Sequence, residues 1–132
     1  MENKEVKIGI VSCASNASNT GRLTSLISIE LLKALGEIAG ICSLPAIATN
    51  VPRQTHLVKS IPKLVVIDGC HQECTKNILI RVGIEPSIYI NLEYDFGFKK
   101  EGPFTTFNYK ESDVKGLTSK ILEKINKEEL NV

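Results

Sequence analysis

The stretch from Lys63 to Gly69 constrains the fold more than any other part of the chain. It is a continuous, β-branched apolar run that ends at Asp68 and Gly69, which predicts a strand buried on both faces of a sheet. Shorter runs predict further strands over 7–13, 37–42 and 87–92. Helices are predicted over 22–35, 52–60, 71–82 and 112–129, and loops over 45–51 and 93–109.

Strands that alternate with helices predict one α/β domain over residues 1–132. Parallel strands need crossover connections, usually helices, which then cover the faces of the sheet. We therefore expect a three-layer α/β/α sandwich, Rossmann-like, with a mainly parallel sheet of about four or five strands. No internal repeat, low-complexity tract or domain linker interrupts the pattern.

Charge and the N-terminal residues narrow the expected partners and location. The net charge is +1, aromatic residues make up 5% of the chain and tryptophan is absent, so neither nucleic acid nor a membrane is an expected partner. Residues 1–5 lead straight into the first predicted strand, without the apolar run of about 7–15 residues that a signal peptide needs. We expect a cytoplasmic protein, in which clustered cysteines more often bind metal or carry out redox chemistry than form disulfides.

The chain contains four cysteines, and each lies at or near the end of a predicted strand. Cys13 and Cys42 close the first two strands, and Cys70 directly follows the strand that begins at Lys63. The carboxyl ends of parallel strands meet along one rim of a sheet, which is where ligands bind in such folds. Cys74 would lie one turn from Cys70 on the same face of a helix that begins near Cys70. We therefore expect all four sulfurs at one rim.

Four thiolates at one rim suit a zinc ion. Structural zinc takes four thiolate or imidazole ligands in a tetrahedron, with the sulfur at about 2.3 Å. A helix that begins near Cys70 would also lower the pKa of that thiol. The metal ion is the expected partner, and the sequence indicates neither a substrate nor a protein partner.

Other interpretations of the same cysteines stay open. An iron–sulfur cluster uses the same type of ligand. One or two reactive cysteines could instead serve thiol-based redox chemistry, or transfer sulfur or metal to a partner. Cys13 and Cys42 both follow apolar runs, and a cysteine in such a place is often only a small buried apolar residue.

The tripeptide Asp68-Gly69-Cys70, with the later Cys74 and Lys76, resembles the centre of the DGC domain family. The resemblance covers about the first 90 residues and includes Ser12-Cys13-Ala14-Ser15 with Gly21, Gly40-Ile41-Cys42 and Val82-Gly83-Ile84. It implies zinc binding through Cys13, Cys42, Cys70 and Cys74, and it implies no particular reaction.

This chain departs from the family pattern at two positions. His71 stands where relatives often have proline, and Thr75 where they often have alanine. His71 is therefore an alternative metal ligand, or a hydrogen-bond donor to one.

Three other features are weighed as functional candidates. The polar loop before the first helix could bind an anion through backbone N–H groups, although such residues more commonly cap helices and form turns; its members are Ser15, Asn16, Ser18, Asn19 and Thr20. Asp68 is expected to accept backbone N–H bonds or to support a ligand residue rather than to act in catalysis. His56 is expected to be solvated on a surface helix.

Overall fold

A parallel sheet is the centre of the computed structural model, which describes residues 5–130 apart from the side chains of 129 and 130. In this part of the chain the strands are β1 (Ile8–Ser12), β2 (Ala39–Ile41), β3 (Lys63–Asp68) and β4 (Ile88–Asn91). Their order is β2-β1-β3-β4 and all pairs are parallel. The order reverses between β1 and β3, because the chain runs out to the edge strand β2 before it crosses back. The predicted parallel sheet is confirmed.

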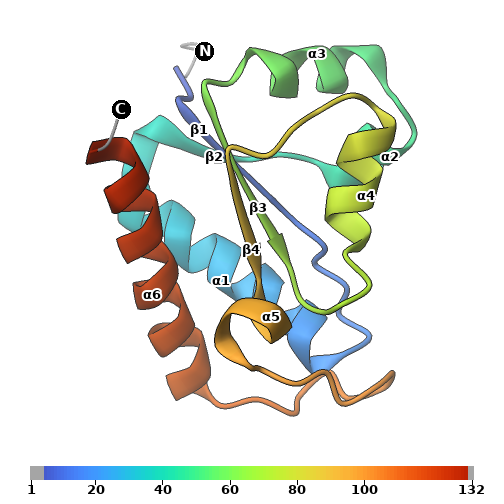
Figure 1. Ribbon diagram of the computed structural model, residues 1–132, viewed down its shortest axis with the longest axis vertical. Helices are drawn as coiled ribbons and strands as arrows, with labels where there is room; N and C mark the ends of the chain where they lie inside the picture. Colours follow the sequence, from blue (N-terminus) through green and yellow to red (C-terminus); the bar gives the residue numbers. More distant parts are fainter. Residues whose placement is uncertain (1–4, 131–132) are drawn as a thin grey trace.

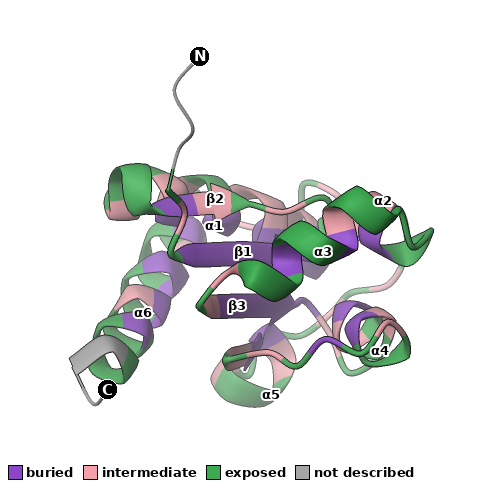
Figure 2. Ribbon diagram, turned by 90° about the horizontal axis from the view of Figure 1, so that it is seen from above, coloured by how far each residue is buried: buried purple, intermediate pink, exposed green. Residues whose placement is uncertain are grey.

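Helices cover both faces of this sheet and complete the predicted α/β sandwich (Figures 1 and 2). α1 (Asn19–Leu35) and α6 (Glu111–Leu130) pack on one face through a core that includes Ile27, Ile67 and Ile121. The other face is covered by α2 (Leu44–Ala48), α3 (Pro52–Ser60) and α4 (Cys74–Arg81), whose core includes Val66 and Leu79. None of the described helices combines the length and the apolar character needed to cross a membrane.

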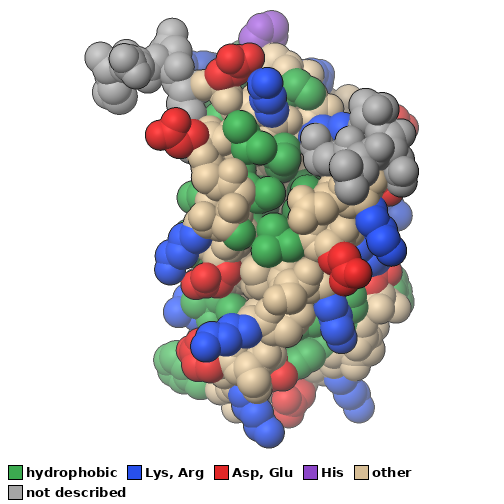
Figure 3. All heavy atoms as spheres, turned by 90° about the vertical axis from the view of Figure 1, so that its left-hand side faces the viewer, with side chains coloured by type: hydrophobic (Ala, Val, Ile, Leu, Met, Phe, Trp, Pro, Cys, Tyr) green, Lys and Arg blue, Asp and Glu red, His purple; other side chains and the backbone are tan. Residues whose placement is uncertain are grey.

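The α1–α6 side of the molecule shows how this core reaches the surface (Figure 3). Apolar side chains gather in the middle of this view, between charged side chains at its margins. Partly buried residues of both helices, among them Leu26, Leu35 and Leu122, pack against the core beneath. The apolar stripes predicted for the two helices therefore face one common core.

Two segments predicted as loops contain short helices. Residues 45–51 include most of α2, and 93–109 include most of α5 (Leu92–Phe96). Each has a polar cap: Ser43 accepts a hydrogen bond from the N–H of Ala46, and Asn91 accepts from the N–H groups of Glu93 and Tyr94. Neither helix is long enough for apolar residues to recur along one face, so the periodicity that predicts longer helices is absent.

Two longer helices begin at other residues than predicted. α1 starts at Asn19 rather than Arg22, because the Ser18 side chain caps it through the N–H of Gly21. α4 starts at Cys74 rather than near His71. Glu73, just before it, has a left-handed backbone with φ of 52°, so the chain turns sharply there. Cys70 and Cys74 consequently do not share a helical face, and that part of the sequence prediction is wrong.

Candidate metal centre

A cavity of about 300 Å³ lies at the carboxyl ends of β1 and β3, where the strand order reverses. Open parallel sheets bind ligands at this place. Cys13 follows β1, Cys70 lies just beyond β3 and Cys74 begins α4, and all three line the cavity. In Figure 1 these strand ends point downward, toward α5 and the segment that follows it. The structure thus brings three of the four predicted ligands into one cavity.

Cys42 lies in an adjoining, more apolar cavity of about 380 Å³. Three residues line both cavities: Cys13, Leu44 and Ile78. The half-buried Cys42 side chain packs against the core beneath α2–α4, and this burial raises the pKa of its thiol. Cys42 therefore shares a cavity with Cys13, but it does not line the cavity of Cys13, Cys70 and Cys74.

The thiol at the start of α4 does not have the lowered pKa that was expected of a cysteine at a helix start. The sequence placed the helix start at Cys70, whereas Cys74 occupies it. Burial raises the pKa of Cys74, and the charge of Asp68 and the neighbouring Cys70 and Cys13 raise it further, against a lowering effect of Lys100. A bound divalent cation would reverse this preference, because it deprotonates a coordinating thiol.

Asp68 holds the start of α4 in place of a local capping residue. The side chain of Glu73, the residue before the helix, makes no capping hydrogen bond. Instead the buried Asp68 carboxylate accepts hydrogen bonds from the N–H of Thr75 (2.9 Å) and the N–H of Lys76 (3.1 Å). The Tyr89 hydroxyl donates a third bond at 3.0 Å. The carboxylate thus ties the end of β3 to the helix that carries Cys74.

Gly69 allows the end of β3 to approach the start of α1. A Cβ atom at this position would lie 2.8 Å from the carbonyl carbon of Thr20 and 3.1 Å from the nitrogen of Gly21. Only a residue without a side chain fits so close to another backbone. The Asp-Gly-Cys sequence therefore combines a helix cap, a close backbone contact and a thiol that faces the cavity.

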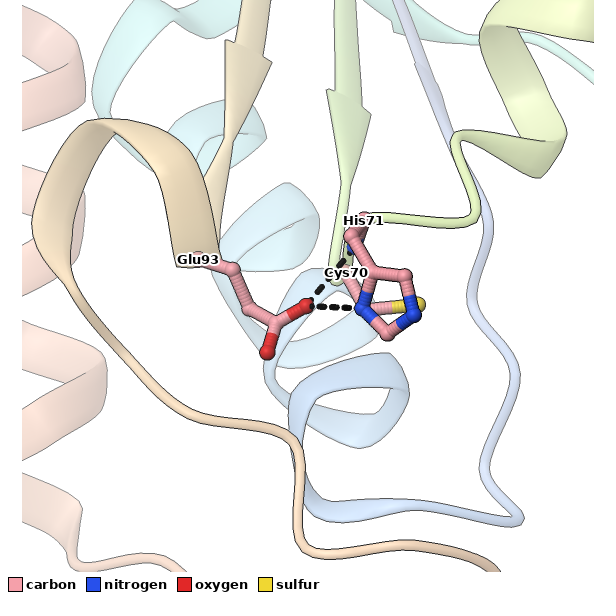
Figure 4. Close-up of side chains that lie close together, drawn as sticks. All are labelled: Cys70, His71 and Glu93. Carbon is pink, nitrogen blue, oxygen red and sulfur yellow. Dashed lines mark hydrogen bonds and ion pairs between the residues drawn. The ribbon is translucent and has the colours of Figure 1, made fainter.

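Asn91 and Glu93 fix the turn that carries Cys70 and His71. Asn91 Nδ2 donates a hydrogen bond to the carbonyl oxygen of Cys70 at 2.9 Å. Glu93 Oε1 accepts the His71 N–H at 2.7 Å and lies 2.8 Å from His71 Nδ1 (Figure 4). Glu93 Oε2 accepts the N–H of Lys100 at 3.2 Å. Burial alone would raise the pKa of Glu93, but the hydrogen bonds from His71 and Lys100 lower it overall.

Cys70, His71 and Glu93 form a compact group of metal-ligand types. The Cys70 sulfur, a His71 ring nitrogen and a Glu93 carboxylate oxygen all lie within 4.8 Å of one another. In the described part of the chain, no three of the cysteine sulfurs are gathered as closely. Asn91 and Glu93 were not predicted as site residues. The available signal was their position at the same rim as the cysteines, since Asn91 ends β4 and Glu93 follows it by two residues.

The residues predicted as a polar loop form the segment before α1 and, with Asn19 and Thr20, the start of α1 itself. They are engaged mainly in internal contacts. The buried Asn19 side chain donates to the carbonyl oxygen of Lys99 (3.1 Å) and accepts from the N–H of Glu101 (3.0 Å). Asn16 Oδ1 accepts a weak bond from Arg22 at 3.4 Å. These contacts hold the segment after α5 against the loop.

The remaining loop residues lie at the cavity. Ser15, Ser18 and Thr20 line the cavity. Its charged lining residues are of both signs, the acidic Asp68 and Glu73 and the basic Lys100. The buried hydroxyl of Thr20 has no hydrogen-bond partner among the described residues. Anion binding by this loop stays a prediction. His56 is exposed on α3.

Comparison with known families covers most of the chain. The family model described as the DGC domain matches residues 9–121 of the 132 residues. The matched region contains the four cysteines, the Asp68-Gly69-Cys70 tripeptide, Asn91 and Glu93. No curated protein and no solved structure gives a significant match.

Proposed function

Because this chain belongs to the DGC domain family, we propose that it is a zinc-binding protein with a thiolate centre at the carboxyl rim of its sheet. The proposed ligands are Cys13, Cys42, Cys70 and Cys74. One observation carries the proposal: three of these cysteines, which come from two strand ends and one helix start, line a single cavity at the point where the strand order reverses. Thiolate sulfur is a preferred ligand of zinc.

Cys42 decides which kind of zinc centre this is. A fourth sulfur closes the coordination sphere, as in structural sites, whereas three protein ligands leave one position open for water or another molecule. Cys42 lines a cavity that it shares with Cys13 but not with Cys70 and Cys74, and a four-sulfur site needs its sulfur to reach the other three. This placement favours, as the second candidate, a protein with an open position that transfers its metal.

Metal content tests the proposal directly. Protein purified anaerobically is expected to carry about one zinc per chain, with its thiols protected from alkylation. Cys13→Ser, Cys70→Ser and Cys74→Ser should each reduce the bound zinc to a small fraction of the wild-type amount. Ser43→Ala, which changes the neighbour of Cys42 but no ligand, should leave it unchanged.

Cys42→Ser separates the two kinds of centre. Loss of zinc in this variant identifies a closed four-sulfur site, and retention identifies an open site with three protein ligands. Wild-type protein that holds neither zinc nor iron, with all thiols reactive, would contradict the proposal. Visible absorption together with bound iron would replace zinc with an iron–sulfur cluster.

Zinc affinity is expected to rise with pH between about 6 and 8. The pKa values of the Cys42 and Cys74 thiols are raised, so both are protonated at neutral pH and must lose a proton to bind zinc. A lower pH adds competing protons and weakens binding by up to about tenfold per pH unit for each proton displaced. Competition with a chelator at several pH values measures the slope, and a flat profile would contradict this assignment of the ligands.

A further inference from the structure

We propose that Cys70, His71 and Glu93 form an outer metal-binding site through which a zinc ion enters the thiolate centre. The inference rests on the proposed function for the destination of the ion, but its own evidence is a separate group of side chains. Two elements bring these side chains together, the turn after β3 and the start of α5 after β4 (Figure 4). The site is thus a product of the fold rather than of neighbouring positions in the sequence alone.

The three donor atoms lie close to zinc-binding geometry. They are all within 4.8 Å of one another, and His71 Nδ1 is 2.8 Å from Glu93 Oε1. Ligand atoms bound to a tetrahedral zinc are roughly 3.3–3.7 Å apart. The nitrogen and oxygen therefore separate by about half an ångström on binding, and the sulfur approaches by up to about one ångström.

Charge also matches a divalent cation. A thiolate, a carboxylate and a neutral imidazole carry two negative charges in total, which neutralise one Zn²⁺. The ion takes the place of the hydrogen bond between His71 Nδ1 and Glu93 Oε1. The neutral imidazole that binds it through Nδ1 carries its proton on Nε2, and the thiol proton of Cys70 leaves to solvent. Two hydrogen bonds between a side chain and the backbone keep the turn in position: Asn91 Nδ2 donates to the Cys70 carbonyl oxygen (2.9 Å), and the His71 N–H donates to Glu93 Oε1 (2.7 Å).

Cys70 links the outer site to the thiolate centre. The His71 side chain is 62% exposed and that of Glu93 is 18% exposed, while the half-buried Cys70 and the exposed Cys74 both line the cavity. An ion that first meets the exposed imidazole can therefore pass to the centre while it stays bound to the Cys70 sulfur. It exchanges His71 and Glu93 for Cys13 and Cys74, and no oxidant or reductant takes part. Three protein ligands leave a fourth position open, which favours such exchange.

The rate of zinc uptake by the reduced, metal-free protein tests this route. Zinc supplied as a complex with a weak chelator is expected to load His71→Ala and Glu93→Gln at least about tenfold more slowly than the wild type. The final zinc content should be the same, because both variants keep the four proposed thiol ligands, and each still allows the hydrogen bond from the N–H of residue 71 to the side chain of residue 93. Two control variants should load at the wild-type rate. His56→Ala removes the other histidine of the chain, which is also exposed, and Glu85→Gln changes another glutamate, which is exposed.

The outcomes separate this inference from the proposed function. A wild-type protein that takes up no metal overturns both. Equal uptake rates in wild type, His71→Ala and Glu93→Gln overturn the entry site alone, and so does loss of all zinc from His71→Ala, which would make His71 a ligand of the centre itself.

Cobalt binding shows the outer site directly. The double variant Cys13→Ser/Cys74→Ser removes two of the four proposed ligands of the centre and leaves Cys70 to the outer site. It should still bind Co²⁺ weakly, with the near-ultraviolet charge-transfer band of one thiolate. Adding His71→Ala should abolish this band. A double variant that retains its helical circular dichroism and binds no Co²⁺ would overturn the outer site, and the uptake rates of the single variants decide the question if the double variant does not fold.

Discussion

Gly69→Ala is expected to destabilise the protein by about 3 kcal/mol. The new Cβ would lie 2.8 Å from the carbonyl carbon of Thr20, 2.9 Å from its oxygen and 3.1 Å from the nitrogen of Gly21. All of these are backbone atoms of the first turn of α1, so no side chain can rotate to make room. The end of β3 and the start of α1 must separate, which disturbs the wall of the cavity that holds Cys70.

Urea denaturation followed by circular dichroism measures this effect, because the chain has no tryptophan to report it by fluorescence. Gly116→Ala is the matched control. A Cβ at Gly116 meets nothing within 4 Å and lies in the middle of α6, where alanine should stabilise the helix by up to about 1 kcal/mol. A Gly69→Ala protein as stable as the wild type would show that the two backbones do not need this close contact.

The layered fold could be predicted because its signals are local and repeat. The apolar run before Asp68 matches a strand buried over almost its whole length. In α1, Leu23, Ile27 and Leu31 recur on one face, and all three are fully buried. The pattern of apolar residues within each segment was sufficient for this prediction, because one face of each strand or helix packs directly on the sheet or on a helix.

The start of α4 could not be predicted in this way because its cap is not local. Helix-like spacing indicates that residues near 71–82 are helical, but the first residue depends on which group accepts the free N–H groups. That group is the Asp68 carboxylate, which belongs to the preceding strand. The helix predicted from periodicity therefore starts near Cys70, whereas α4 starts at Cys74.

The candidate site was predicted in part for a related reason. Strand ends indicate the rim on which a side chain lies, and Cys13 and Cys70 lie there together. Which way a side chain turns at that rim depends on contacts with other elements. Cys42 lines the adjoining cavity rather than the main one, and Glu93 meets His71 only because β4 lies beside β3.

Asp68→Ala is expected to cost about 4 kcal/mol of stability, the largest effect of any single substitution considered. Two backbone N–H groups, of Thr75 and Lys76, and the Tyr89 hydroxyl would lose their acceptor. A hydrogen bond to a charged group contributes about 1.5–3 kcal/mol, and a buried donor left without a partner adds a desolvation penalty. Asp113→Ala is the control, since its carboxylate accepts one exposed N–H bond from Lys110 and its loss should cost about 1 kcal/mol.

Asp68→Asn separates the shape of this carboxylate from its charge. The amide keeps one acceptor oxygen, but its NH₂ group faces one of the groups that donate to Asp68 in the wild type. The free energy of unfolding should therefore fall measurably, but by less than in Asp68→Ala. Burial is the main reason that the pKa of Cys74 is raised, and the charge of Asp68 is the next. Removing that charge should lower the pKa and speed alkylation of Cys74 near neutral pH, relative to the wild type. A folded Asp68→Asn protein whose Cys74 reacts no faster would show that the carboxylate acts on α4 alone, and has no part in setting the protonation of the thiol that α4 carries.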